Sequence, residues 1–244
     1  MSATDAFIPW ATPSYWGRER EYVNDALESV WISGGPYVDR FELEFANALG
    51  VAHAITVSNG TTALHLAMLG LEIEPGDEVI LPGFGFMAAA NIVLHMGARP
   101  VFADVDPATW CMDPESVAAK VSNRTKAIVP IHTYGCAADL SSLRNLCMSK
   151  GIALIEDAAE ALGTKFGGLQ VGTVGAVGTF SFHATKTITT GEGGMVTTND
   201  DALNERMRLF RNHGMSGRRY YHHVAGHNFR MTNLQAALGC AQLE

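Results

Sequence analysis

The chain has 244 residues, of which 47% are hydrophobic and 17% are charged, a composition typical of a globular protein with a sizeable core. Its formal net charge of -8 argues against broad binding to nucleic acids or anionic membranes. No apolar run approaches the roughly 18 residues that span a membrane, and the N-terminus lacks the pattern of a signal peptide. The four cysteines form no Cys-x-x-Cys pair, so neither a metal site nor a disulfide framework is expected. We therefore expect a cytoplasmic protein with reduced thiols.

The first 50 residues predict an irregular aromatic arm followed by two helices. The helical patterns run from about residue 19 to 30 and from 37 to 49, and Gly50 is expected to cap the second helix. Between them lies a Gly-Pro turn with Trp31 and Ser33. A loop of this kind often lines a site, but Trp31 could equally be buried in the core.

From residue 52 onward the chain alternates short apolar strands with amphipathic helices. This pattern predicts βαβ units and a mostly parallel sheet sandwiched by helices, which is an α/β fold. We expect one α/β domain over residues 51–211. The strands are expected at 53–57, 78–81, 100–104, 127–131, 152–156 and 178–182, and the helices at 61–70, 86–96, 114–121 and 139–150.

The first strand ends in Ser58-Asn59-Gly60-Thr61-Thr62, a glycine turn that opens a helix. The free N–H groups and dipole of a helix N-terminus bind phosphate, and threonine hydroxyls add donors. Asn59 or Thr61 could instead serve only as the helix cap.

The second strand ends in LPGFGFMA, which matches G-x-G-x-x-A with Asp104 about 20 residues further on, the nominal dinucleotide fingerprint. That fingerprint normally occupies the first βα turn, and here another turn does. Phe86 could stack on a flat heterocycle or fill the core.

Strands five and six end in chemically active residues. Asp157, in IEDAAE, could pair with a cationic ring or a metal, or could cap a helix. Lys186 follows an apolar strand and is flanked by small residues, and only five of the 17 basic residues are lysines. A desolvated amine becomes a usable nucleophile and forms Schiff bases, although a strand-end lysine can also simply reach solvent.

The segment from Arg206 to Arg230 contains six arginines and four histidines without an acidic residue. An anion pocket for a phosphorylated small molecule, a solvated basic face and a nucleic-acid patch are the alternatives, and no nucleic-acid motif supports the last.

Together these strand ends offer a phosphate cradle, an aromatic plate, a carboxylate and a lysine, a set that suits pyridoxal 5′-phosphate. The motifs SNGTTALHLA, PGDEVILP, GARPVFADVDP, IEDAAEALG, FSFHATK, GEGGM and GHNFRMTNLQAA resemble the DegT/DnrJ/EryC1/StrS family of sugar aminotransferases. The resemblance extends from about Pro9 to Glu244. It implies the large domain of the type I, aspartate aminotransferase-like fold of pyridoxal-phosphate enzymes.

The resemblance also implies roles for individual residues. Lys186 would bind the cofactor aldehyde covalently, Asp157 would pair with the pyridine nitrogen, and Glu160 would lie near the phenolic oxygen. Phe86 would stack on the ring. The phosphate would be held by Gly60, Thr61, Thr62 and Ser181, and by Asn228 supplied across a homodimer interface. His183 and Arg230 are candidates for the diphosphate of the substrate.

The implied reaction is ping-pong transamination from L-glutamate to a nucleotide-linked 4-keto-6-deoxysugar, used for O-antigen lipopolysaccharide or a related glycan. KTITTGEGGM and FRMTNLQAA favour GDP-4-keto-6-deoxymannose as the acceptor. The alternatives are an NAD(P)-linked oxidoreductase that uses Gly83, Gly85 and Ala88, and a catalytically silent cofactor-binding chain.

The family continues beyond the point where this sequence stops, into a smaller domain that closes over the substrate. We therefore expect the sequence to be a fragment. Residues 212–244 would begin the C-terminal part, residues 1–50 would form the arm and first helices, and an apolar face would lie where the absent domain packs.

Overall fold

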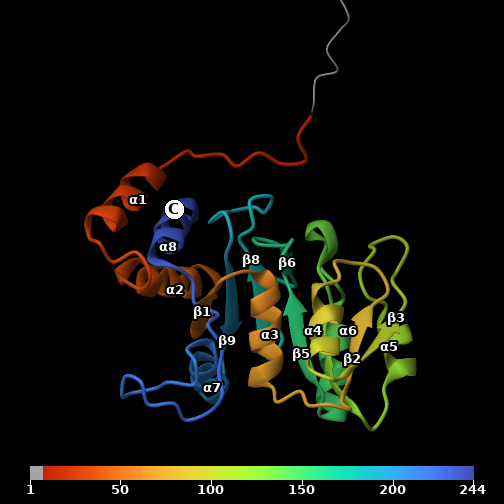
Figure 1. Ribbon diagram of the computed structural model, residues 1–244. Helices are drawn as coiled ribbons and strands as arrows, with labels where there is room; N and C mark the ends of the chain where they lie inside the picture. The colour runs from red at the N-terminus through yellow and green to blue at the C-terminus, as the bar shows by residue number, and fades with distance from the viewer. Residues whose placement is uncertain (1–7) are drawn as a thin grey trace, which may run out of the picture.

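The computed structural model describes residues 8–244 and consists of a seven-stranded sheet with helices on both faces (Figure 1). The first seven residues of the expected arm lie outside the described residues. None of the described helices is both long enough and apolar enough to cross a bilayer.

The sheet is mostly parallel, as the sequence predicts. Four neighbouring pairs run parallel, and β9 alone among the seven strands runs antiparallel to both of its neighbours. A two-stranded hairpin, β6 (Lys165–Phe166) with β7 (Leu169–Gln170), stands apart from it. The spatial order is β1 (His53–Val57), β9 (Gly194–Thr198), β8 (Val177–Ser181), β5 (Ala153–Asp157), β4 (Thr125–Ile128), β2 (Glu78–Pro82) and β3 (Arg99–Ala103).

Alternating side chains of the strands enter two separate cores, one on each face of the sheet. In β2, Val79 and Leu81 enter one core and Ile80 enters the other. The first core is covered by α3 (Gly60–Gly70), α4 (Ala88–His95) and α7 (Asp201–Arg211). The second is covered by α2 (Pro36–Leu49), α5 (Pro114–Lys120) and α6 (Leu140–Lys150).

The helix boundaries follow from local sequence. Gly50 and Gly151 adopt left-handed φ values of 70° and 65°, where glycine avoids the steric penalty of a side chain, and they end α2 and α6. Asp139 caps the N-terminus of α6 by accepting the N–H of Ser142. The α4 helix begins at Ala88 rather than at Phe86, so Phe86 is left in the loop.

The first and last helices of the chain pack together. The C-terminal helix α8 (Asn233–Leu243) lies against α2 and α1 (Glu19–Glu28) (Figure 1). Gly239 makes this close approach possible, since a Cβ there would lie 2.7 Å from the ring of Phe41. The expected division into 1–50, 51–211 and 212–244 stays a prediction.

A buried carboxylate ties α2 to the sheet and to α7. Glu42 accepts hydrogen bonds from the backbone and hydroxyl of Thr56 on β1, both at 2.9 Å. It also pairs with Arg208 at 2.8 Å and Arg211 at 2.6 Å. Although burial opposes ionisation, the two arginines and the Thr56 N–H hold the pKa of Glu42 below its usual range.

Candidate active site

A cavity of about 500 Å³ opens at the carboxyl ends of the parallel strands. Asp157 is the last residue of β5, Ser181 is the last of β8, and Gly60 is the first of α3. Strands that run in the same direction bring their ends to one edge of the sheet, and ligands of such folds bind there. Eight of the predicted site residues line this cavity: Gly60, Thr61, Phe86, Asp157, Glu160, Ser181, His183 and Lys186.

The Asp157 carboxylate forms the floor of the cavity. The residue is 5% exposed, and its Oδ1 accepts the N–H of Ala159 at 3.1 Å. Burial raises the pKa of the Asp157 carboxyl, which the Ala159 N–H and the charges of His132 and Lys186 only partly oppose. A buried carboxylate with so few donors is suited to a cationic partner that is supplied by a ligand.

The Lys186 amine lies in the same cavity and faces a second carboxylate. Its Nζ is 3.5 Å from Oε1 of Glu160, and its side chain is 23% exposed. Glu160 is oriented by the backbone N–H of Tyr134, which donates to Oε2 at 2.9 Å. The amine is therefore oriented toward the cavity rather than free in solvent.

The N-terminus of α3 provides the expected anion cradle. The first N–H groups of a helix have no intrahelical partner, and here Asn59 Oδ1 accepts that of Thr62 at 2.9 Å. Gly60 permits the close approach of Ser181, because a Cβ on Gly60 would lie 2.8 Å from the Ser181 Cβ. Gly60, Thr61 and Ser181 all line the cavity, so their N–H and hydroxyl groups are available to one anion.

Thr62 does not line this cavity. Its hydroxyl accepts the Asn59 N–H at 3.1 Å and lies 2.8 Å from the Asn59 carbonyl oxygen, which closes a reciprocal capping box. The structure therefore gives Thr62 a cap role, and its predicted contact with a phosphate stays a prediction.

The glycines of the apparent dinucleotide fingerprint contact protein. The Gly83 N–H donates to the carbonyl of Ala103 at 2.8 Å, and a Cβ on Gly85 would lie 2.5 Å from Cδ1 of Ile131. A Cβ on Gly83 would also lie 3.3 Å from the Ala103 carbonyl oxygen, so close packing against protein explains both glycines without a nucleotide. Phe86 lines the cavity and is 76% exposed, so its ring face is available to a ligand.

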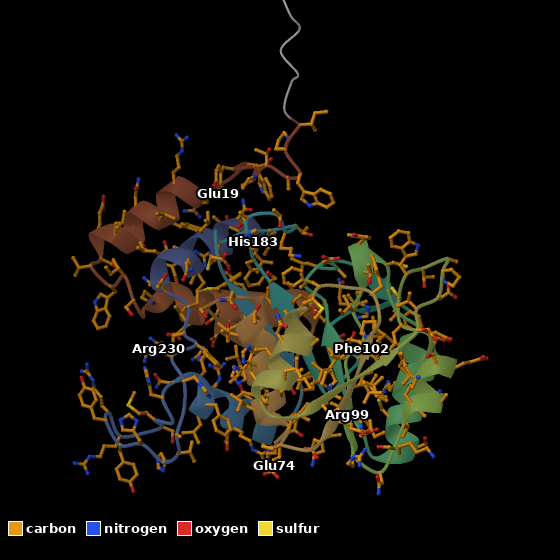
Figure 2. All side chains as sticks on the ribbon, turned by 45° about the vertical axis from the view of Figure 1, so that its right-hand side comes forward. Glu19, Glu74, Arg99, Phe102, His183 and Arg230 are labelled. Atoms are coloured by element: carbon orange, nitrogen blue, oxygen red, sulfur yellow. The ribbon has the colours of Figure 1, made fainter. Side chains whose placement is uncertain are left out.

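Asn228 and Arg230 do not join this cavity within the chain. Figure 2 shows His183 and Arg230 well apart on the molecule. Arg230 donates to Asn212 at 2.6 Å, and the same segment passes the end of β1, where the Ser58 N–H donates to the Phe229 carbonyl at 2.9 Å. Neither Asn228 nor Arg230 lines the active-site cavity, and their predicted roles stay predictions.

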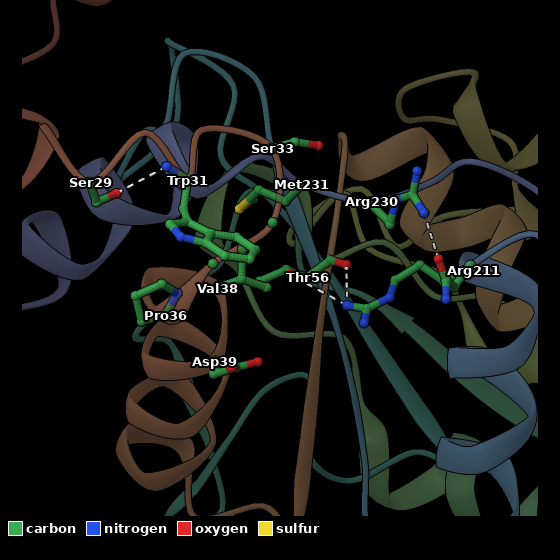
Figure 3. Close-up of a pocket in the computed structure, with 13 residues that line it drawn as sticks. Ser29, Trp31, Ser33, Pro36, Val38, Asp39, Thr56, Arg211, Arg230 and Met231 are labelled. Atoms are coloured by element: carbon green, nitrogen blue, oxygen red, sulfur yellow. Dashed lines mark hydrogen bonds between the residues drawn. The ribbon is translucent and has the colours of Figure 1, made fainter. Parts of the chain in front are cut away.

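Arg230 instead lines a second cavity of about 780 Å³, shown in Figure 3. Its walls include Trp31 and Ser33 from the loop between α1 and α2, and Arg211 from α7. Trp31 is 67% exposed, so the alternative of a core tryptophan is wrong. Neither Lys186 nor Asp157 lines this cavity.

The basic segment does not form one continuous face. Arg208 and Arg211 pair with Glu42, and Arg206 pairs with Glu72 at 3.0 Å. These arginines join elements of the fold, which leaves only part of the segment's charge for a ligand.

Several residues that line the active-site cavity were not among the predicted site residues. Trp10 reaches it from the N-terminal arm, Thr179 from within β8, and Glu192 from the glycine-rich loop. The GEGGM motif marked that loop, and Glu192 lies 3.8 Å from the His183 ring. Trp10 could not be predicted because its position depends on the path of an irregular arm.

Comparison with known proteins identifies the family. The DegT/DnrJ/EryC1/StrS aminotransferase family matches residues 14–244. The chain belongs to this family. Its members are pyridoxal-phosphate-dependent. In this chain Lys186 and Asp157 line one cavity. The fold assignment from sequence is confirmed.

Among individual family members, a GDP-perosamine synthase of Vibrio cholerae is 51% identical over 239 residues, 97% of this chain. The aminotransferase of Psychrobacter cryohalolentis has a TM-score of 0.91 at 40% identity and covers 97% of this chain and 63% of its own. A mutant of GDP-4-keto-6-deoxymannose-3-dehydratase (ColD), solved with bound GDP-perosamine, has a TM-score of 0.92 at 28% identity, covering 97% of this chain and 68% of its own. The chain spans 65% of the length of the Vibrio cholerae relative.

Proposed function

We propose that the protein containing this chain is a pyridoxal-phosphate-dependent aminotransferase that moves an amino group from L-glutamate to a nucleotide-linked 4-keto-6-deoxysugar. The observation that carries this proposal is the shared cavity of Lys186, Asp157 and the α3 N-terminus. The 51% identity to a GDP-perosamine synthase favours GDP-4-keto-6-deoxymannose as the acceptor and GDP-perosamine as the product.

The residues present fit pyridoxal phosphate. Asp157 offers to the ring nitrogen a buried carboxyl whose pKa is raised by burial, and a cationic partner there would offset that burial. Lys186 offers the amine that binds the aldehyde. When bound, the cofactor supplies a ring that accepts the electrons released as the substrate's α-proton leaves. The phosphate would contact Gly60, Thr61 and Ser181, and the ring face would contact Phe86.

The proton transfer falls to the chain's own groups. The Lys186 amine would be the base inside the cavity that removes the α-proton and returns it to a neighbouring carbon. Glu160, 3.5 Å from Nζ, holds the amine in place through Coulomb attraction and is itself fixed by the Tyr134 N–H. Asp157 favours a positive charge beside it, which stabilises the electron-rich ring.

Few residues of this chain are candidates for binding the nucleotide-linked sugar. His183 lines the cavity and can meet a phosphate oxygen at its rim. Asn228 would serve the site of a second subunit in a homodimer, and Arg230 is a candidate for the diphosphate of the substrate; neither lines the active-site cavity of its own chain. A cytoplasmic enzyme of O-antigen or related glycan synthesis is part of the same proposal.

The test uses the full-length protein and its Lys186→Ala and Lys186→Arg variants. The wild type should turn over L-glutamate and the GDP-linked ketosugar, and both variants should lose steady-state turnover by about 10³-fold or more. Circular dichroism checks that the fold is retained. Retained turnover in either variant would refute the role of Lys186. A wild type that binds the cofactor but exchanges no amino group with L-glutamate would support the alternative of a silent cofactor-binding chain.

A further inference from the structure

Two of the four cysteines lie against each other although 25 positions separate them. The Cys111 thiol donates to the carbonyl oxygen of Cys136 at 3.2 Å. Cys111 is buried and Cys136 is exposed. Burial raises the pKa of the Cys111 thiol, and the adjacent Cys136 side chain adds to the effect. Cys147 and Cys240 are buried in the core, each on its own helix.

We propose that Cys111 and Cys136 are a redox modification site that closes to a disulfide in the presence of a hydroperoxide and thereby changes the active-site cavity. Reactivity toward peroxides follows exposure and thiolate character, so the exposed Cys136 is the residue that meets the oxidant. The buried Cys111 is the partner that resolves the product.

The chemistry balances in two steps. The Cys136 thiolate attacks one oxygen of hydrogen peroxide, forms the sulfenic acid and releases hydroxide, which takes up a proton as water. The Cys111 sulfur then displaces the sulfenic hydroxyl, the S–S bond forms, and its thiol proton leaves with a second water. The peroxide is reduced by two electrons, and the two thiols are oxidised by two. A dithiol reverses the change by thiol–disulfide exchange.

The turn that joins this pair to the cavity is short. It is the 3₁₀ turn η1 (Thr133–Gly135), and Tyr134 within it has a positive φ of 50°, an uncommon conformation for a residue with a side chain. The Tyr134 N–H donates to Glu160, and Glu160 faces Lys186. The carbonyl of Gly135 also accepts the hydroxyl of Thr164 at 2.9 Å.

We expect closure of the disulfide to shift this turn. To form a sulfur–sulfur bond of about 2.05 Å with Cys136, the Cys111 sulfur must leave the Cys136 carbonyl oxygen that it now contacts at 3.2 Å. The turn next to it carries the only donor that the described residues supply to Glu160 Oε2. We therefore infer that oxidation weakens the Tyr134–Glu160 contact and releases the Lys186 amine from its fixed position. This second half of the inference rests on the proposed function, while disulfide formation does not.

The test treats the full-length protein, loaded with pyridoxal phosphate, with hydrogen peroxide and then with dithiothreitol. Peptide mapping should identify a Cys111–Cys136 disulfide after peroxide and its loss after the dithiol. Hydrogen exchange of the peptide that contains Tyr134 should become faster on oxidation, because its N–H loses an acceptor. Aminotransferase activity should fall by about tenfold or more and recover on reduction, as a misplaced catalytic group allows.

The Cys136→Ser variant should keep the activity of the reduced enzyme and lose the response to peroxide. Cys147→Ala is the matched control and should respond as the wild type does. Oxidation of Cys136 to the sulfinic acid without a disulfide to Cys111 would overturn the proposal. A mapped disulfide with unchanged exchange at Tyr134 would overturn the link to the cavity. If the wild type has no aminotransferase activity, the proposed function fails, while the mapping and exchange results still decide this proposal.

Discussion

The carboxylate of Asp157 is the group whose replacement tests the site most sharply without a substrate. In the described residues it has one hydrogen-bond donor, the Ala159 N–H, although it is 5% exposed. An ionised carboxylate in such a position lowers the stability of the chain until a cation binds to it. Asp157→Asn removes the charge and nearly keeps the shape, so we expect the cofactor-free variant to be more stable than the wild type.

The magnitude follows from the donor count. Leaving a buried polar group poorly paired costs about 1–3 kcal/mol, and more for a charged group, so the gain in unfolding free energy near pH 8 should be about 1–3 kcal/mol. Burial raises the pKa of Asp157 in the folded chain above 3.8, its ordinary value. Between the pKa of the unfolded chain and the higher pKa of the folded chain, the folded state therefore binds more protons than the unfolded chain. The wild type then loses stability as pH rises through this window, and the gain of the variant shrinks toward pH 4.

The neighbouring residue provides a matched control. Glu156 is fully buried, and its two oxygens accept the N–H groups of Gly172, Val174 and Gly175 at 2.6–2.7 Å and contact His132 at 3.1 Å. The same loss of charge in Glu156→Gln should therefore destabilise the chain by about 3 kcal/mol or more.

The assay is urea unfolding of the cofactor-free full-length protein and both variants between pH 4 and pH 8, together with cofactor titration. Asp157→Asn should bind pyridoxal phosphate more weakly than the wild type while unfolding at higher urea. Two results would show that burial of the Asp157 charge does not destabilise the cofactor-free chain. One is a lower unfolding free energy of Asp157→Asn than of the wild type near pH 8, and the other is a stability gain of the variant that grows as pH falls.

Two further substitutions test other contacts. Asn59→Ala removes the cap of α3 and should lower the unfolding free energy by about 1 kcal/mol and weaken cofactor binding. If urea unfolding and cofactor titration both give the wild-type values, Asn59 does not stabilise the start of α3. Glu42→Gln should destabilise the chain by about 3 kcal/mol at neutral pH, because it leaves Arg208 and Arg211 without their buried carboxylate. Because the pKa of Glu42 is lowered in the folded chain, the stability that its carboxylate contributes is lost as pH falls through this lowered pKa. The difference in unfolding free energy between Glu42→Gln and the wild type should therefore narrow in acid. A difference that does not change with pH would contradict this role of Glu42.

The sequence predicted the cavity better than it predicted the contacts around it. Asp157, Ser181 and Lys186 could be placed together because parallel strands end at one edge of a sheet. The position of β9 between β1 and β8, antiparallel to both, could not be predicted, because the sequence of an apolar strand does not indicate which strands it pairs with. Strand and helix ends differed from the prediction by up to three residues, as at α4 and β4, where local sequence is ambiguous.

Contacts between residues far apart in the chain were beyond the sequence. The basic segment predicted an anion pocket, but Arg208 and Arg211 pair with Glu42, which lies more than 160 positions earlier. Thr62 predicted a phosphate contact, and the structure closes a capping box with its hydroxyl. In both cases the residue type indicated a group that forms polar contacts, but the sequence did not indicate which residue it contacts.

The central claim is that Lys186 holds pyridoxal phosphate covalently. Sodium borohydride reduces an imine to a stable amine, so the reduced full-length protein can be digested and the modified peptide sequenced by mass spectrometry. We expect a single pyridoxyl group on Lys186 that is absent from the Lys186→Ala variant. A modification at another lysine, or cofactor bound with no covalent adduct, would contradict it.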